Sequence, residues 1–105
     1  MKGVCLTLYT YELEKHHGIL LYEWLLEQAK KQGIHGGSVF RAVAGYGLHH
    51  VMHEAHFLEL GANVPVEIRF ILENPIADNF LAYLKKEGVK LFYTLHEVME
   101  YGRLE

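Results

Sequence analysis

The order of the elements expected in this chain indicates an α+β, ferredoxin-like fold: strand, helix, strand, strand, helix, strand. Apolar residues alternate with a period of two in the segments assigned to strands and recur every three or four positions in two others. A chain of 105 residues, half of them hydrophobic, suits one compact domain, which we expect over residues 1–105. This fold forms an antiparallel sheet with two helices on one face.

The first half of the chain is expected to contain a strand, a helix and a second strand. The strand over 4–11 has two rather apolar faces, which suits a central position in a sheet. The polar segment 12–18 is expected to be a connection, and the helix over 19–32 to end at Gly33. The second strand is expected over 38–46, with Arg41 on the face opposite to Phe40.

The second half repeats this pattern with clearer signals. Residues 64–73 alternate strictly between apolar and other side chains, as a strand does. Asn74-Pro75 then provides an N-cap followed by proline at the first helical position, and Gly88 ends the helix. A last strand is expected over 91–101, with an interruption near 94–95.

Two helices cover only one face of such a sheet, and the other face is expected to be chemically mixed. It is expected to carry Cys5, Thr7, Tyr9, Tyr11, Arg41, Glu67, Arg69, Ile71 and Glu73. This set is too apolar to face bulk water and too charged to form a hydrophobic core within a single chain. Assembly of several copies through this face would resolve the conflict.

Composition excludes several classes of function. The net charge is −3 with histidine neutral, and no basic run exceeds two residues, which argues against nucleic-acid binding. No apolar run approaches the roughly 20 residues of a membrane span, and the chain enters a strand without a signal-peptide core. We therefore expect a cytoplasmic protein with no membrane insertion. No catalytic residues are expected, because no nucleophile–base pair accompanies Cys5 or the single serine, Ser38.

Four histidines fall within eight positions after the second strand: His49, His50, His53 and His56. A helical turn would place three of them, at 49, 53 and 56, on one face, as imidazole ligands of Zn or another divalent transition metal. The alternative is a solvated loop that is merely rich in histidine. The zinc-protease pattern is absent, because the spacing from 53 to 56 is one residue too short.

The segment Gly45-Tyr46-Gly47 precedes these histidines. Its glycines allow backbone N–H groups to approach an anion closely, although such a pair is also common at a plain bend. Arg41 either binds a ligand phosphate or carboxylate or forms an ion pair with Glu67 or Glu73 across the sheet.

Several motifs resemble those of PII proteins, and more closely those of the PII-like family called domain of unknown function 190. Gly45-Tyr46-Gly47 resembles the base of the PII signalling loop, and the segment 87–92 resembles the PII turn after the second helix. The family's own patterns are similar to Glu12-Leu13-Glu14-Lys15-His16-His17-Gly18, Leu21-Tyr22-Glu23, Ser38-Val39-Phe40-Arg41 and Val64-Pro65-Val66-Glu67-Ile68. The chain departs from the family at Ile19-Leu20, where Lys-Pro is usual, and from PII proteins at Leu48, where a phosphate-binding arginine follows the glycines.

The resemblance implies a homotrimer that binds a small ligand, such as an adenine nucleotide, in clefts between chains. The implied ligand-binding residues are Gly45, Tyr46, Gly47, Gly88, Lys90 and Arg103, with His16 and Arg41 as further candidates. The segment 48–63 would then signal to a membrane transporter or another regulated protein. The alternative is a trimer like the CutA proteins that binds a divalent metal through the histidines.

Overall fold

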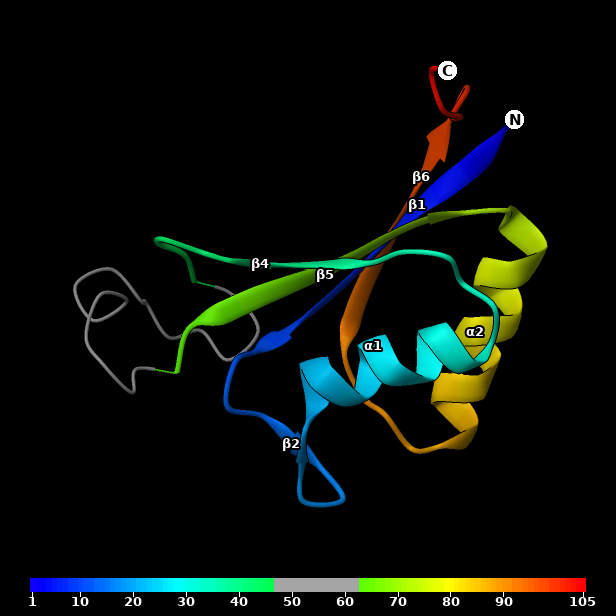
Figure 1. Cartoon of the computed structure of the whole chain (residues 1–105). Coiled ribbons are helices and arrows are strands. Elements are labelled where there is room, and N and C mark those ends of the chain that lie inside the picture. Colours follow the sequence, from blue (N-terminus) through cyan, green and yellow to red (C-terminus); the bar gives the residue numbers. More distant parts are fainter. Residues whose placement is uncertain (47–62) are drawn as a thin grey trace.

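The structure is a computed structural model of the chain, and it describes residues 1–46 and 63–105. Gly47 and the four clustered histidines, together with nearly all of the segment 48–63, lie outside the described residues. The elements in chain order are β1 (Gly3–Tyr11), β2 (Lys15–His16), β3 (Ile19–Leu20), α1 (Leu21–Lys31), β4 (Ser38–Arg41), β5 (Pro65–Leu72), α2 (Asn74–Lys86) and β6 (Phe92–Val98) (Figure 1).

Four strands form a sheet in the order β4-β5-β1-β6, and each neighbouring pair is antiparallel. Both helices lie on the same side of this sheet (Figure 1). Each helix connects two strands that are separated in the sheet by another strand, as in the split βαβ arrangement. The predicted ferredoxin-like fold is therefore confirmed.

The hydrophobic core lies between the sheet and the helices. Val4, Leu6 and Leu8 of β1 are at most 8% exposed, and β5 places Phe70 and Ile68 opposite Leu6 and Leu8. The helices complete this cluster with buried residues that include Trp24, Leu25, Ala29, Phe80 and Leu84. The alternation in both strands thus selects the core face, as the sequence predicts.

The chain between β1 and α1 is more ordered than a simple connection. β2 and β3 form a small hairpin, so α1 begins at Leu21 and not at residue 19. The two residues of its turn, His17 and Gly18, have φ of 52° and 81°, as the favoured two-residue type I′ turn requires. A positive φ is uncommon for a residue with a side chain, and histidine is among the residues that tolerate it best.

Two predictions about the outer strands are wrong. β4 ends at Arg41, five residues before the predicted end. β6 runs without interruption from Phe92 to Val98, because Thr94 and Leu95 pair with Thr7 and Leu6 of the central strand.

The face of the sheet that the helices leave uncovered also differs from the expectation. Arg41 lies opposite Val66, which belongs to the core face, whereas Phe40 lies opposite Glu67. Phe40 therefore lies on the uncovered face and Arg41 on the helix side, the reverse of the prediction. Glu73, also predicted for this face, is the N-cap of α2 and lies beyond the end of β5.

The uncovered face still exposes large apolar side chains. Phe40, Ile71 and Phe92 are 48%, 53% and 56% exposed. Polar residues such as Arg69 lie on the same face, so the mixed character predicted for this face is retained. Among the described residues, neither helix is long and apolar enough to cross a membrane.

Candidate functional site

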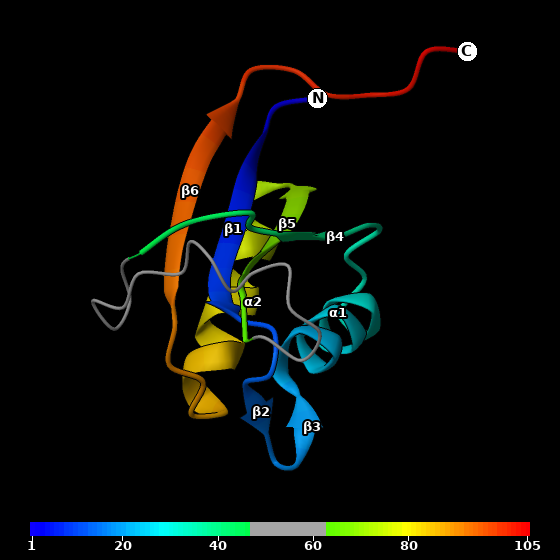
Figure 2. The same ribbon diagram turned by 90° about the vertical axis from the view of Figure 1, so that its left-hand side faces the viewer.

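A cavity of about 630 Å³ opens where the described chain leaves β4. Its walls come from β1, from the segment 42–46 that follows β4, and from the first residues of β5 and β6. Figure 2 shows the segment after β4, in green, crossing in front of β1 toward the side of β6. We call this space the loop-base cavity and define it by six of its lining residues: Tyr9, Gly45, Tyr46, Pro65, Glu67 and Phe92.

Aromatic rings form one wall of the loop-base cavity. Tyr9 and Phe92 are opposite each other in adjacent strands, and their ring centroids lie 5.4 Å apart with the planes tilted by 53°. The Tyr9 hydroxyl lies 3.3 Å from the hydroxyl oxygen of Thr94. Tyr46 is 78% exposed at the rim. This wall suits a flat apolar ligand group, because aromatic side chains pack well on such rings.

Glu67 is the charged residue among the described lining of this cavity. Its Oε1 accepts a hydrogen bond of 2.9 Å from Nη2 of Arg69. This hydrogen bond and the negative charge of Glu67 raise the pKa of the Arg69 guanidinium. The second carboxylate oxygen of Glu67 accepts no hydrogen bond from another described residue.

Arg41 directly precedes the segment that lines the cavity, but its side chain hydrogen-bonds Glu12, which lies outside the described lining. Its guanidinium donates two hydrogen bonds to Glu12 Oε2, one of them from Nε at 3.1 Å. The predicted partners, Glu67 and Glu73, are therefore wrong. The cause is the register of β4, which directs Arg41 toward the helix side and the segment after β1.

The segment after β1 also holds the chain where it returns to β5. The Glu12 N–H donates to the carbonyl oxygen of Val64 at 2.8 Å, and the Leu13 N–H donates to Asn63 Oδ1 at 2.9 Å. Residues 12–13 therefore contact the last residue of β4, Arg41, and also Asn63 and Val64, which directly precede β5.

His16, another predicted ligand residue, lies in the β2–β3 hairpin. Its ring packs on Trp24 of α1 at 4.3 Å and on His17 at 4.2 Å between centroids. Its Nε2 is buried and has no hydrogen-bond partner among the described residues. Trp24 is 7% exposed and belongs to the hydrophobic core.

The remaining candidates do not line the loop-base cavity within one chain. Gly88 and Lys90 belong to the turn after α2, where Gly88 has φ of 79°. Arg103 lies in the C-terminal segment, 3.4 Å from Glu105, and this segment is at the other end of the molecule from that turn (Figure 1). The structure thus brings Gly45 and Tyr46 together in the cavity but leaves His16, Arg41, Gly88, Lys90 and Arg103 outside its described lining.

The sequence analysis did not identify four of the six residues that define the cavity: Tyr9, Pro65, Glu67 and Phe92. Tyr9 and Glu67 were expected on the uncovered face, and the alternation of their strands was a usable signal. Phe92 gave no such signal, because its position opposite Tyr9 depends on the register of the last strand.

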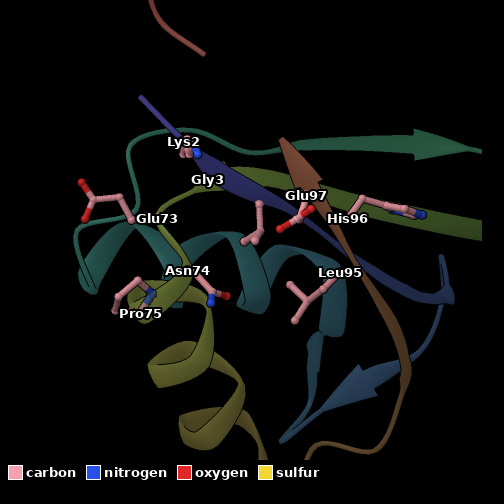
Figure 3. A pocket seen from close by; sticks show the side chains of 9 residues that line it. Lys2, Gly3, Glu73, Asn74, Pro75, Leu95, His96 and Glu97 are labelled. Carbon is pink, nitrogen blue, oxygen red and sulfur yellow. The ribbon is translucent and has the colours of Figure 1, made fainter. Parts of the chain in front are cut away.

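A second cavity, of about 510 Å³, lies at the start of α2. Asn74 and Glu97 point toward it, whereas the His96 ring points away (Figure 3). Within residues 1–46 and 63–105, no group of three or more histidine, cysteine, aspartate or glutamate residues could hold a metal ion.

Residues 3–99 match the family model DUF190, described as "Uncharacterized ACR". The chain belongs to the DUF190 family. A UPF0166 protein of Aquifex aeolicus is 35% identical over 85 residues, covering 81% of each chain. A UPF0166 protein of Methanocaldococcus jannaschii is 32% identical over 100 residues, covering 91% of this chain and 92% of the relative.

Solved structures similar to this DUF190 protein include PII-like proteins. CPII, a nitrogen regulatory PII-like protein of Thiomonas intermedia bound to ADP, AMP and bicarbonate, superposes with a TM-score of 0.69 at 15% identity, covering 95% of this chain and 89% of CPII. A candidate PII-like signalling protein of Thermus thermophilus superposes with a TM-score of 0.66 at 17% identity, covering 92% and 87% of the two chains. At these identities the likeness shows a shared PII-like fold.

Proposed function

We propose that this DUF190 protein is a PII-like regulatory protein that binds an adenine nucleotide in the loop-base cavity. The observation that carries the proposal is the position of this cavity, at the point where Gly45 and Tyr46 lead into the segment 48–63. Its volume of about 630 Å³ lies within the range of about 300–1,000 Å³ usual for small-molecule sites. The ADP and AMP bound to CPII support the same ligand class.

The chemistry of the lining favours the adenine ring as the part of the nucleotide that enters. Tyr9 and Phe92 provide an aromatic wall, and the carboxylate of Glu67 can accept a hydrogen bond from an exocyclic amine. The same carboxylate would repel a phosphate, so the phosphates are expected to lie nearer to the backbone N–H groups of Gly45 and Tyr46.

The positive charge that the phosphates need is expected to come from a neighbouring copy. Gly88, Lys90 and Arg103 do not line the loop-base cavity within one chain, so we expect them to act from the partner subunit. The apolar residues exposed on the uncovered face, including Phe40 and Ile71, are the surface on which three copies would assemble. A homotrimer would thus complete three identical clefts.

The proposed consequence of binding is regulation without catalysis. A nucleotide at Gly45 and Tyr46 would bias the conformation of the segment 48–63, which would engage or release a partner in the cytoplasm. A membrane transporter is the partner class that the PII-like fold suggests by analogy.

Isothermal titration with ADP, AMP and ATP, each with and without bicarbonate, tests this proposal. Wild-type protein is expected to bind at least one nucleotide, and Glu67→Gln and Lys90→Gln are each expected to weaken binding by about tenfold, equivalent to about 1.4 kcal/mol. Lys31→Gln removes the same charge as Lys90→Gln from an exposed site on α1 and should bind like wild type. Absence of binding, and of thermal stabilisation, at millimolar nucleotide would contradict the proposal.

The histidines at 49, 50, 53 and 56 support a second candidate function. Their spacing suits imidazole coordination of Zn or a similar ion, which would make the protein a metal-binding trimer like the CutA proteins. Native mass spectrometry of gently purified protein separates the two functions, because a retained metal and a retained nucleotide differ in mass. Replacement of His49, His53 and His56 by alanine should abolish metal retention if this function is correct.

A further inference from the structure

A third cavity, of about 580 Å³, lies on the same uncovered face as the loop-base cavity. It extends from the chain that precedes β4 across β5 to β1. We call it the Arg69 cavity and define it by Cys5, Gly36, Ser38, Phe40, Arg69 and Ile71. Arg69 is the charged residue of its described lining, so the cavity favours a negatively charged ligand group.

The Arg69 guanidinium is held in place by two contacts. Its Cζ lies 4.8 Å above the centroid of the Phe40 ring, and Nη2 bonds to Glu67 Oε1 at 2.9 Å. The side chain nevertheless remains 50% exposed. A guanidinium carries five N–H donors, and the hydrogen bond to Glu67 engages one of them. A planar group held in this way suits two-point recognition of a carboxylate or phosphate.

Hydroxyl groups flank Arg69 on both sides. Ser38 of β4 and Thr7 of β1 are its register partners in the two neighbouring strands. Residues opposite each other in antiparallel strands have Cβ atoms about 5 Å apart. Ser38 is exposed, so its hydroxyl is available to donate to an oxygen that Arg69 binds.

The backbone before β4 adds further donors. The N–H groups of Gly36 and Gly37 donate to no other residue in the described part of the chain. A Cβ atom at Gly36 would meet nothing within 4 Å, so this side of the cavity is open to a ligand. Gly37 has a separate structural reason to be glycine, because a Cβ atom there would lie 2.5 Å from Phe70.

We propose that the Arg69 cavity is a second ligand site, which binds a small oxyanion through the Arg69 guanidinium and the Ser38 hydroxyl. Both a carboxylate and a phosphate present the oxygens that these donors recognise. The site does not depend on nucleotide binding. Phe40 and Ile71 line this cavity and also belong to the surface proposed for assembly of three copies. In a trimer the same donors could therefore meet a carboxylate of another copy instead, and the experiment separates these two sources.

The test is a titration of full-length protein with sodium phosphate and with sodium acetate at constant ionic strength and without nucleotide. Two-dimensional NMR would follow the Arg69 Nε–Hε signal and the Gly36 and Ser38 amides. We expect saturable shifts of all three groups with at least one of the two anions. Arg69→Gln and Arg69→Lys should each weaken binding by tenfold or more, the lysine variant because it lacks the planar fork, and Ser38→Ala by several-fold.

Lys31→Gln is the matched control, since it removes a positive charge from an exposed site on α1 and should leave anion binding unchanged. Circular dichroism and sedimentation velocity would verify the fold and assembly of every variant. Shifts that do not saturate, or that persist in Arg69→Gln, would overturn the proposal. Dissociation of Arg69→Gln into monomers, with no effect of either anion on the wild type, would also overturn it and assign Arg69 to a contact between copies. Ser38→Ala leaves the Glu67–Arg69 hydrogen bond in place, so ADP binding by this variant reports separately on the loop-base cavity, and the two proposals can fail independently.

Discussion

Arg69 Nη2 donates a hydrogen bond of 2.9 Å to Glu67 Oε1 on the uncovered face of β5. Each residue lines a different cavity: Glu67 lines the loop-base cavity, and Arg69 lines the cavity beside Ser38. The pair therefore joins the two places on this face where a ligand could bind. A ligand that changes the bonding of one residue would act on the other directly.

Glu67→Gln separates the role of this pair in stability from its role in binding. The two side chains are 33% and 50% exposed, so solvent screens their attraction. We expect the free energy of unfolding in urea to change by less than about 1 kcal/mol. A much larger loss would show that Glu67 supports the fold, and a loss of nucleotide binding could then not be assigned to its carboxylate.

The ion pair between Arg41 and Glu12 should contribute more than an ordinary surface pair. Glu12 is 21% exposed and bonds Arg41 through two nitrogens. A double-mutant cycle with Glu12→Gln and Arg41→Gln, measured by urea denaturation, should give a coupling energy of about 1 kcal/mol.

The Glu27–Lys31 pair of α1 is the control for this cycle. Its side chains are 58% and 64% exposed at 3.4 Å, and exposed pairs at this spacing contribute about 0.3–0.5 kcal/mol. Equal coupling energies for the two pairs would show that the shielding of Glu12 has no energetic effect.

Gly37→Ala should destabilise the fold, whereas Gly36→Ala should not. A Cβ atom at Gly37 would lie 2.5 Å from Cε1 of Phe70, which is 1% exposed and packs against Phe80 at 5.7 Å between ring centroids. Because this ring cannot move freely, we expect a loss of about 1–3 kcal/mol. At Gly36 a Cβ atom would meet nothing within 4 Å, so the midpoint temperature of thermal unfolding should be unchanged or slightly raised.

A charge on the uncovered face should prevent assembly. Ile71 is 53% exposed there, and Ile71→Lys would place an ammonium group in the proposed interface between copies. Sedimentation velocity at micromolar concentration should show a trimer for the wild type and monomers for the variant. Leu13→Lys, at a site that is 47% exposed and lies outside the sheet, should remain trimeric. A wild-type monomer would remove the trimer from the proposed function.

Tyr22 should give the fold a small sensitivity to alkaline pH. Partial burial and the neighbouring carboxylates of Glu23 and Glu12 raise the pKa of its phenol above the usual 10.0. The folded state therefore favours the protonated phenol. This contribution is fully present below about pH 10 and is lost as the pH rises through the pKa of the folded state.

An NMR titration of the tyrosine Cζ carbons would detect the raised pKa of Tyr22 directly. Tyr22→Phe should remove that transition and lose less stability between neutral pH and about pH 11 than the wild type. An ordinary pKa at Tyr22 would show that the nearby Arg41, which acts in the opposite direction, outweighs the carboxylates.

The sequence by itself determined the order of the two helices and the four strands of the main sheet, and the core faces of β1 and β5, but it did not reveal the β2–β3 hairpin. The alternation in β5 and the apolar period in α1 reflect burial, which the chain must achieve in any arrangement that folds. Gly45 and Tyr46, which follow the second strand, line a cavity in the structure, and their role in ligand binding stays a prediction.

Only the tertiary structure decided the face of β4 and the partner of Arg41. β4 is short, and Val39 and Phe40 are both apolar, so its residues do not reveal which face is buried. Pairing with β5 made that choice, because a shift of one residue moves every side chain to the other face. The two cavities of the uncovered face depend on the same choice, since their walls combine side chains from strands that are distant in the sequence and meet only through the register of the sheet.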